Sequence, residues 1–266
     1  MRSAYFLIAV TIFSAFSFKP DATAQSQICP QYAKDLLSHS RQLITVMTAN
    51  WNANHGPLIL WERPAVTSPW QMSSKPVDAI IGRNGMAWGF PYATLQGTLS
   101  SKSGIAKHEG DGKSPAGVYA FGRRFGFADQ PDSSDNYLKI LPTTVCIDDP
   151  HSSHYNQIVD SVQVAKDWKS AENMHGIDLY RSGVEILYPS DAKAQAGSCI
   201  FFHITSKKEK GTSGCTSVSE DAMKTIQATL KSEFKPTIVL LPHSELAKWA
   251  DCFPGLPMMA GAGGEL

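Results

Sequence analysis

Short apolar runs, separated by clusters of Gly, Pro, Asn and Ser, dominate the first half of the chain. Runs of this length between turn-forming residues are typical of β-strands. Asn84-Gly85 adds the dipeptide that tight hairpin turns favour. The pattern predicts strands at residues 43–48, 58–62, 77–81 and 117–121.

The second half combines strands with one amphipathic helix. Its apolar runs predict strands at residues 184–188, 199–204 and 237–241. Residues 219–230 predict a helix. Ser217 followed by Glu220 has the spacing of a capping box, and Ser219 is an alternative N-cap. The apolar face of this helix consists of Met223, Ile226 and Leu230.

The middle of the chain, residues 129–182, is polar and mixed. Asp148-Asp149-Pro150 breaks regular structure there, and residues 166–174 predict a short helix. No fixed-period repeat divides the chain. We therefore expect a single domain at residues 25–266 that is mainly β (α+β), a sandwich or barrel with a few helices.

The first 24 residues have the pattern of an export signal. Arg2 supplies the positive charge, residues 4–18 are almost purely apolar, and Ala22-Thr23-Ala24 is a small-x-small cleavage site. This run is shorter than the roughly 20 residues of a membrane span, and no later segment is long and apolar enough. We expect a mature chain from Gln25, in the periplasm or cell wall and without a membrane span.

Charge and composition narrow the classes of function. The chain has 24 Lys and Arg against 24 Asp and Glu, so its formal net charge is zero. Binding to a phosphate backbone requires a basic surface, so nucleic acid is not expected as a partner. With 42% hydrophobic residues, the chain can form a packed core rather than a disordered tail.

Five cysteines in an exported chain predict disulfides and at least one unpaired thiol. Cys29 and Cys252 flank the domain near its two ends, which often lie close together, so they are the preferred pair. Cys146 and Cys199 can form a second bridge. Four cysteines allow three connectivities, and spacing does not select among them. This pairing leaves Cys215 as the odd cysteine.

A histidine and this odd cysteine are placed to act together. Strand alternation puts Cys199, Phe201 and His203 on one face and three apolar side chains on the other. A polar loop then leads to Ser213-Gly214-Cys215, just before the predicted helix. That distance suits a hairpin-like return, which brings the thiol back beside the imidazole.

Three features favour Cys215 as a nucleophile. A model cysteine has a pKa of about 8.5, so its thiolate must be stabilised. A nearby helix N-terminus favours the anion, and His203 can accept the proton. Gly214 allows a tight turn in which the amides of Ser213, Gly214 and Cys215 stabilise a tetrahedral intermediate.

Three segments of the chain resemble a known enzyme family. His203 with Thr212-Ser213-Gly214-Cys215-Thr216 is similar to the signature of the L,D-transpeptidase (YkuD-type) domain, in which a strand histidine precedes an S/T-x-G-C cysteine. Residues 107–119 are similar to its Gly-Asp-Gly-basic-Thr-Pro-x-Gly segment. A variant with Cys-x-Asp-Asp-Pro and Tyr-Asn matches Cys146 to Pro150 and Tyr155-Asn156. Together these landmarks cover residues 77–242.

The resemblance implies an L,D-transpeptidase-like fold and a cysteine acyl transfer that requires no cofactor and no metal. It implies peptidoglycan stem peptides as substrates and carbapenem-type β-lactams as covalent inhibitors. Cys215 would be acylated, and His203 would be general base and then general acid, oriented by the carbonyl of Ile204. The oxyanion hole would be the amides of residues 213–215. Candidate substrate-binding residues are Glu109, Asp111, Tyr155, Asn156 and Thr212.

The chain departs from the family pattern at two positions. Ser213 stands where a histidine is usual, which leaves His203 as the base. Ser217 stands where an arginine is usual, which puts the placement of the substrate in doubt. The same acyl-enzyme would give a cross-link with an amine and a shortened stem with water, so L,D-carboxypeptidase or another cysteine hydrolase is the alternative.

Three other interpretations stay open. A buried structural cysteine and a core histidine would show the same residues without catalysis. Asp148, Asp149, His151 and His154 form a metal-like cluster, although no His-Glu-x-x-His element supports a zinc peptidase. A non-catalytic module could bind peptidoglycan through exposed aromatic side chains. The candidates for that are Trp51, Trp61, Trp70 and Trp88.

Overall fold

The structure is a computed structural model that describes residues 30–94, 105–129, 136–206, 210–250 and 255–257. The expected signal peptide and the expected pair Cys29 and Cys252 lie outside these ranges. Within them, none of the helices has the length and apolar character that crossing a membrane requires.

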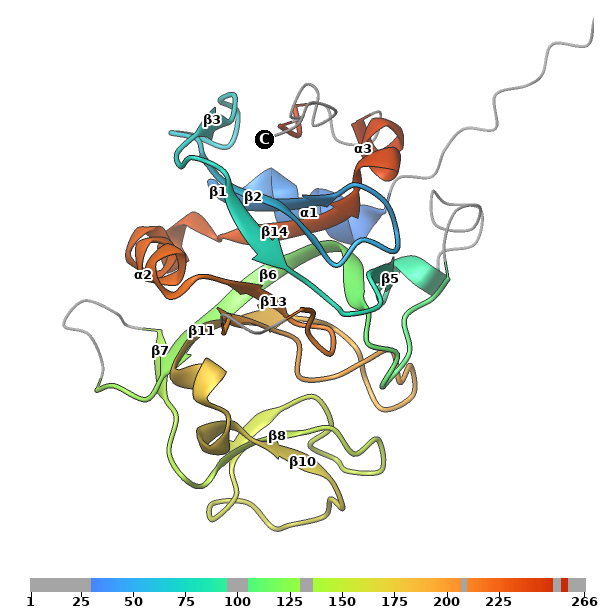
Figure 1. The fold of residues 1–266 in the computed structure, drawn as a ribbon, viewed down its shortest axis with the longest axis vertical. Coiled ribbons are helices and arrows are strands. Elements are labelled where there is room, and N and C mark those ends of the chain that lie inside the picture. Colours follow the sequence, from blue (N-terminus) through green and yellow to red (C-terminus); the bar gives the residue numbers. More distant parts are fainter. Residues whose placement is uncertain (1–29, 95–104, 130–135, 207–209, 251–254, 258–266) are drawn as a thin grey trace, which may run out of the picture.

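Eight strands close into a mixed barrel (Figure 1). β1 and β14 pair in parallel, as do β12 and β13, and the antiparallel pairing of β2 with β1 closes the ring. Closure pairs the edges that an open sheet would leave exposed. Around the barrel the order is β1 (Gln42–Thr48), β14 (Thr237–Pro242), β6 (Ser114–Gly126), β11 (Ser182–Leu187), β12 (Phe201–Ile204), β13 (Thr216–Val218), β4 (Val77–Ile80) and β2 (His55–Glu62).

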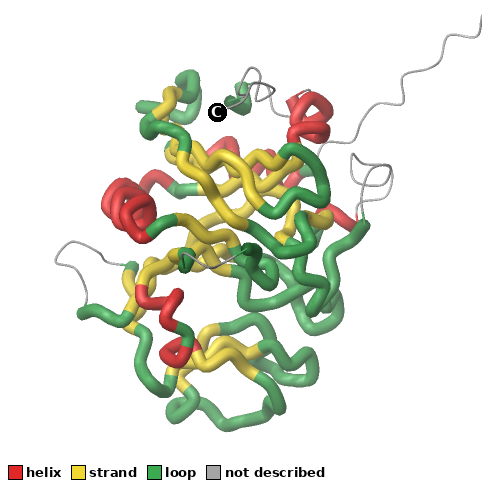
Figure 2. Tube along the Cα trace, viewed as in Figure 1, coloured by secondary structure: helices red, strands yellow, loops and turns green. Residues whose placement is uncertain are grey.

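Short strands and helices surround the barrel (Figure 2). β3 (Gln71–Met72) pairs with β2, and β5 (Met86–Trp88) and β7 (Tyr137–Lys139) pair with β6. The α-helices of the described residues are α1 (Gln31–His39), α2 (Glu220–Thr229) and α3 (His243–Ala250). The 3-10 helices are η1 (Tyr92–Thr94), η3 (Met174–Gly176), η4 (Asp178–Arg181) and η5 (Ser232–Phe234). The prediction of a mainly β chain with a few helices is confirmed.

A small lobe lies below the barrel in Figure 1. Its sheet has the order β10 (Ala171–Asn173), β8 (Thr144–Ile147) and β9 (Ile158–Asp160). The helix predicted at residues 166–174 is wrong, because β10 pairs antiparallel with β8. A short polar segment has little helical stability of its own, so tertiary pairing decides its structure.

Two apolar clusters lie on opposite sides of β12. Ile200, Phe202 and Ile204 belong to the large core of the barrel. Cys199, Phe201 and Cys215 belong to a second cluster that extends toward the lobe. The predicted alternation is therefore confirmed. The strand itself starts only at Phe201, because Cys199 has a left-handed backbone with φ +54°.

Helix α2 forms where the apolar periodicity predicts it, but it starts differently. The Ser219 side chain accepts a hydrogen bond from the amide of Ala222 and is the N-cap. Ser217 lies inside β13, so the predicted capping box is wrong and the alternative N-cap, Ser219, is confirmed. The helix buries Met223 and Ile226 as expected.

Candidate functional site

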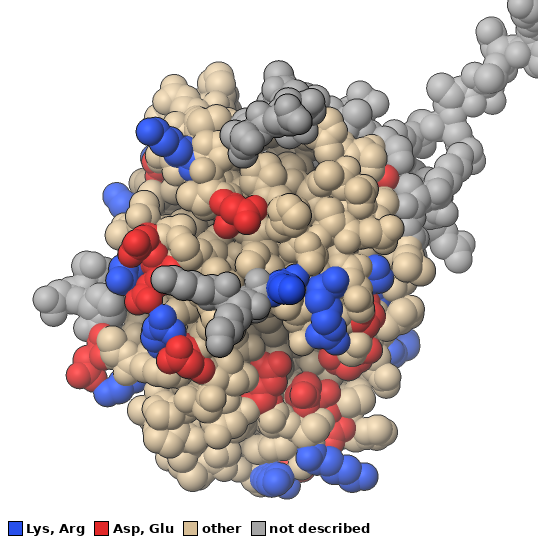
Figure 3. All heavy atoms as spheres, viewed as in Figure 1, with Lys and Arg blue, Asp and Glu red and all other residues tan. Residues whose placement is uncertain are grey.

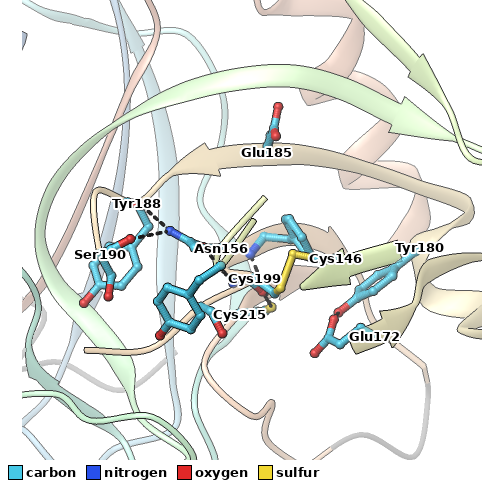
Figure 4. Close-up of a disulfide and its surroundings, with 12 residues drawn as sticks. Cys146, Asn156, Glu172, Tyr180, Glu185, Tyr188, Ser190, Cys199 and Cys215 are labelled. Carbon is cyan, nitrogen blue, oxygen red and sulfur yellow. Dashed lines mark hydrogen bonds between the residues drawn. A yellow bond between two sulfur atoms is a disulfide. The ribbon is translucent and has the colours of Figure 1, made fainter. Parts of the chain in front are cut away.

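Cys215 lies immediately before β13, between the barrel and the lobe. It is the free cysteine of the described residues and is only 7% exposed. Its Sγ accepts a hydrogen bond from the amide of Phe201 at 3.3 Å and lies 3.5 Å from the carbonyl oxygen of Cys199. The sulfur is thus packed against the segment that leads into β12 (Figure 4).

The turn before Cys215 is fixed by two buried hydroxyl groups. Ser114 Oγ lies 2.7 Å from the carbonyl oxygen of Gly214 and 3.1 Å from that of Cys215. Thr212 Oγ1 donates to the carbonyl of Cys215 at 2.6 Å. Gly214 has φ +154°, and a Cβ there would lie 3.1 Å from the carbonyl oxygen of Lys113. Only glycine adopts this backbone without strain.

The three amides predicted to form the oxyanion hole differ in whether they already donate a hydrogen bond within the protein. The amide of Gly214 already donates to Thr212 Oγ1 at 3.1 Å. The amides of Ser213 and Cys215 make no hydrogen bond within the described part of the chain. In this conformation, two of the three predicted amides can therefore meet a substrate oxygen.

His203 is oriented through the main chain, as the resemblance implies. Its Nδ1 lies 2.7 Å from the carbonyl oxygen of Ile204 and donates to it. A proton on Nδ1 leaves the lone pair of the neutral imidazole on Nε2, as a general base requires. His203 is buried, and it lines the same cavity as Cys215, which has a volume of about 300 Å³.

The expected helix N-terminus does not lie next to Cys215. Strand β13 intervenes before α2 begins at Glu220, so the helix dipole falls off before it reaches the sulfur. Burial raises the pKa of the Cys215 thiol to about 12, and the charge of Glu172 adds to this effect. The Phe201 amide, the Tyr180 hydroxyl and the charge of Lys107 oppose it. The resting group is a thiol, so a base must take its proton.

Lys107 places a positive charge beneath the cysteine turn. Its side chain is 2% exposed, and Nζ lies 2.8 Å from Asp111 Oδ1. Asp111 also accepts hydrogen bonds from the amides of His108 and Lys113 at 2.9 Å. Asp111 therefore organises the loop before β6 and does not line the cavity, which Lys107 does. Lys107 belongs to the segment 107–119 that the sequence analysis singled out, but no spacing within that segment marks it.

Glu109 lines the cavity, and Tyr155 supports it from behind. Glu109 Oε2 accepts from the Tyr155 hydroxyl at 2.6 Å and from Ser198 Oγ at 2.9 Å. Burial, followed by the bond to Glu109, raises the pKa of Tyr155 well above its ordinary value. Of the predicted substrate-binding residues, Glu109 and Thr212 line the cavity, whereas Asp111, Tyr155 and Asn156 are outside its lining.

Asn156 and a disulfide hold the segment that precedes β12. Asn156 Oδ1 accepts from the amide of Cys199 at 2.9 Å, while its Nδ2 donates to the carbonyls of Tyr188 and Ser190 (Figure 4). Cys199 is bonded to Cys146 on β8, with an S–S distance of 2.05 Å. The predicted second bridge is confirmed, and it ties the lobe to the cysteine that contacts Cys215.

The sequence pattern does not predict the pair Tyr180 and Glu172 in the middle region. Tyr180 on η4 donates its hydroxyl proton to Glu172 Oε2 on β10 at 2.8 Å, and its ring lies edge-on to that of His203, 5.3 Å away. Both residues line the cavity, together with Asp148. No motif spacing marks them, because pairing within the lobe brings them to the site.

A guanidinium group reaches the rim of the site from outside the signature. The exposed Arg83 donates from Nη1 to Ser213 Oγ at 2.9 Å, and its amide donates to the carbonyl of Thr212 at 2.8 Å. Ser217 is fully buried and pairs with Ile80 of β4. Arg83 thus supplies a positive charge at the rim of the site, whereas the buried Ser217 supplies none.

The residues that suggested a metal site organise a turn. Asp149 accepts from the amide and Nδ1 of His151 at 2.9 and 3.1 Å, and from the amide of Lys169 at 2.7 Å. These bonds, with those to the backbone foremost, lower the pKa of Asp149. Across the described ranges, no group of three or more His, Cys, Asp and Glu side chains is arranged to hold a metal ion.

The tryptophans pack inward. Trp61 and Trp88 are buried in the barrel core, and Trp51 and Trp70 are partly buried against it. They do not form an exposed aromatic platform. Figure 3 shows basic and acidic side chains close together on the face in view, in keeping with the zero formal charge.

No protein-family model matches this chain, and no curated protein matches it.

Proposed function

We propose that the protein is an exported cysteine acyltransferase of the L,D-transpeptidase type that acts on peptidoglycan stem peptides. The observation that carries the proposal is the geometry of His203 and Cys215. A buried thiol and an imidazole with its lone pair on Nε2 line one cavity. The mixed barrel, the turn before Cys215 and the loop at residues 107–113 support the resemblance from which this function comes.

The chemistry follows from these groups. His203 takes the thiol proton, and the sulfur of Cys215 attacks the carbonyl carbon between an L-centre and a terminal D-alanine. The amides of Ser213 and Cys215 stabilise the developing oxyanion. The C–N bond then breaks, and His203 returns the proton to the amine of D-alanine. A thioester on Cys215 remains.

The fate of the thioester decides the product. An amine of a neighbouring stem gives a cross-link, whereas water gives a shortened stem. Three carboxyl groups, of Glu109, Asp148 and Glu172, line the cavity and suit an ammonium-bearing substrate. A carbapenem-type β-lactam would form the same covalent bond to Cys215.

Mass spectrometry of the mature protein with stem tetrapeptides, with and without an amine acceptor, tests the function. We expect loss of D-alanine, and a transient acyl adduct on the peptide that contains Cys215. Joined products would identify a transpeptidase, and shortened stems a carboxypeptidase. Unchanged tetrapeptide, with no adduct on Cys215, would contradict the proposal.

Replacement of Arg83 with alanine is expected to raise KM for the tetrapeptide by about tenfold, with kcat changed by less than about threefold. The guanidinium at the rim suits the terminal carboxylate of the substrate, and its loss weakens binding without removing a reacting group. Steady-state kinetics of D-alanine release measure both constants.

Arg83→Lys is the matched control, because it keeps the charge but loses the planar fork that binds a carboxylate. We expect it to fall between wild type and Arg83→Ala. An unchanged KM in Arg83→Ala would exclude Arg83 from substrate binding.

A further inference from the structure

The hydroxyl of Tyr180 lies between a carboxyl group and the sulfur of Cys215. Figure 4 shows it pointing at Glu172, to which it donates at 2.8 Å. The same hydroxyl lowers the pKa of Cys215, and both residues line one cavity. The Tyr180 ring is buried and packed edge-on by other rings, so the hydroxyl is held in this place. Those rings belong to Phe125, Phe201 and His203.

The surroundings of Glu172 raise the pKa of its carboxyl group toward neutral pH. Burial comes first, and the charges of Asp148 from the loop after β8 and Glu109 from the loop before β6 add to it. The Tyr180 hydrogen bond acts in the opposite direction, and the pKa of Glu172 is raised to about 7. Asp148 Oδ1 is buried without a hydrogen-bond partner among the described residues. The other titratable groups that line this cavity are Lys107, His203 and Cys215.

We propose that the protonation state of Glu172 sets the direction of the Tyr180 hydroxyl and, through it, the nucleophilicity of Cys215. Glu172 is then a positioning residue, and Tyr180 is the group through which it acts on the reacting sulfur. The proposal rests on the proposed function only in taking Cys215 as the nucleophile.

The two states of Glu172 have opposite effects on the thiol. The ionised carboxylate holds the Tyr180 proton, so the phenol oxygen can only accept from the thiol, and the negative charge raises the pKa of Cys215. The neutral carboxyl can donate its own proton to the phenol oxygen. The Tyr180 proton is then free for the thiolate, which it stabilises. Hydrogen bonding and charge both favour the thiolate when Glu172 is neutral.

The sign of the pH dependence follows. Below about pH 7 Glu172 is neutral and the thiolate is favoured relative to the thiol. As the pH rises through about 7, Glu172 loses its proton and the pKa of the thiol increases. The alkylation rate of Cys215 in the wild type should therefore rise with pH in two steps, with a shoulder near pH 7, instead of following one titration.

Iodoacetamide alkylation of the folded protein, followed from pH 5 to pH 10 on the peptide that contains Cys215, tests this directly. In Glu172→Gln the side-chain amide donates to Tyr180 at every pH. We expect a single step, with alkylation at pH 8 about tenfold faster than in wild type, the change for one pKa unit. The shape of the profile separates this role from a structural one, because greater exposure of the thiol would speed alkylation at every pH without removing the shoulder.

Tyr180→Phe supplies an expectation of opposite sign. Loss of the hydroxyl removes the donor that stabilises the thiolate while Glu172 is neutral, so alkylation at pH 6 should be slower than in wild type. This variant and the two-step profile of the wild type keep the test valid if Glu172→Gln does not fold. Glu185→Gln is the matched control, because Glu185 bonds to Arg123 and does not line the cavity.

The outcomes separate this proposal from the proposed function. A Glu172→Gln profile that superimposes on wild type, or alkylation of Tyr180→Phe at pH 6 that is as fast as in wild type or faster, overturns the role of Glu172 even if stem peptides are turned over. The expected shifts without turnover of stem peptides support that role and contradict the proposed substrate, because alkylation does not depend on one.

Discussion

Cys215→Ala is expected to slow the release of D-alanine from stem tetrapeptides by about a thousandfold or more. The substitution removes the only group in the signature that can form the thioester. Release of D-alanine followed by mass spectrometry measures the effect. The fold should persist, because the carbonyls of Gly214 and Cys215 remain bonded to Ser114 and alanine keeps an apolar side chain in the second cluster.

Cys215→Ser is the matched control for shape. A serine hydroxyl has a much higher pKa than a thiol, so His203 should not activate it in the same place, and the variant should be nearly as slow. Because His203 and Cys215 act as a unit, His203→Gln should cost about as much as Cys215→Ala, and the double variant little more. Release of D-alanine at more than a few per cent of the wild-type rate in Cys215→Ala would place the nucleophile elsewhere.

Local patterns predict the barrel well where a strand is a continuous apolar run. The strands of the first half and β14 lie where apolar runs predict them, and α2 buries the expected face. The lobe was not predictable in the same way. Its strands are short and partly polar, and they are stabilised by pairing and by the bond from Cys146 to Cys199.

The same distinction holds for the candidate site. His203 and Cys215 belong to one contiguous stretch, and strand alternation places His203 correctly. The hairpin-like return expected between them is wrong, because β12 and β13 pair in parallel. Glu172 and Tyr180 come from the middle region and Arg83 from the loop after β4, all distant from this stretch in the sequence. Only the folded chain shows that they meet the thiol or the turn before it.

The position of the α2 N-terminus, away from Cys215, shows how tertiary contacts affect the reactivity of the thiol. A capping signal at Ser217 would place α2 directly after Cys215, where its dipole could stabilise a thiolate. Ser217 instead forms part of β13, and the groups that favour the anion are the Phe201 amide, the Tyr180 hydroxyl and Lys107. Two of these three depend on the lobe or on the loop before β6, so thiol reactivity depends on tertiary contacts more than on sequence neighbours.

Removal of the bond between Cys146 and Cys199 by a double replacement with alanine is expected to lower the free energy of unfolding by about 4 kcal/mol. The bridge closes a segment with a sequence separation of 53 residues, and in the unfolded chain it restricts that segment strongly. Urea denaturation followed by tryptophan fluorescence measures the loss.

Activity should fall in the same variant, for a reason separate from stability. Cys199 keeps a left-handed backbone, its amide is held by Asn156, and its carbonyl lies 3.5 Å from the sulfur of Cys215. Without the bridge, β8 no longer restrains this segment, so the Phe201 amide that contacts the sulfur becomes less well placed. Turnover and alkylation of Cys215 should both slow at temperatures where the variant is still folded.

Cys215→Ala is the matched control for this experiment, because it removes a cysteine of the same cluster that forms no bridge. It should lose activity while keeping most of the free energy of unfolding, whereas the double variant should lose stability and part of the activity together. A double variant within about 1 kcal/mol of wild type would contradict the stabilising role of the bridge. Full alkylation rates in that variant would show that the lobe does not position the segment beside the nucleophile.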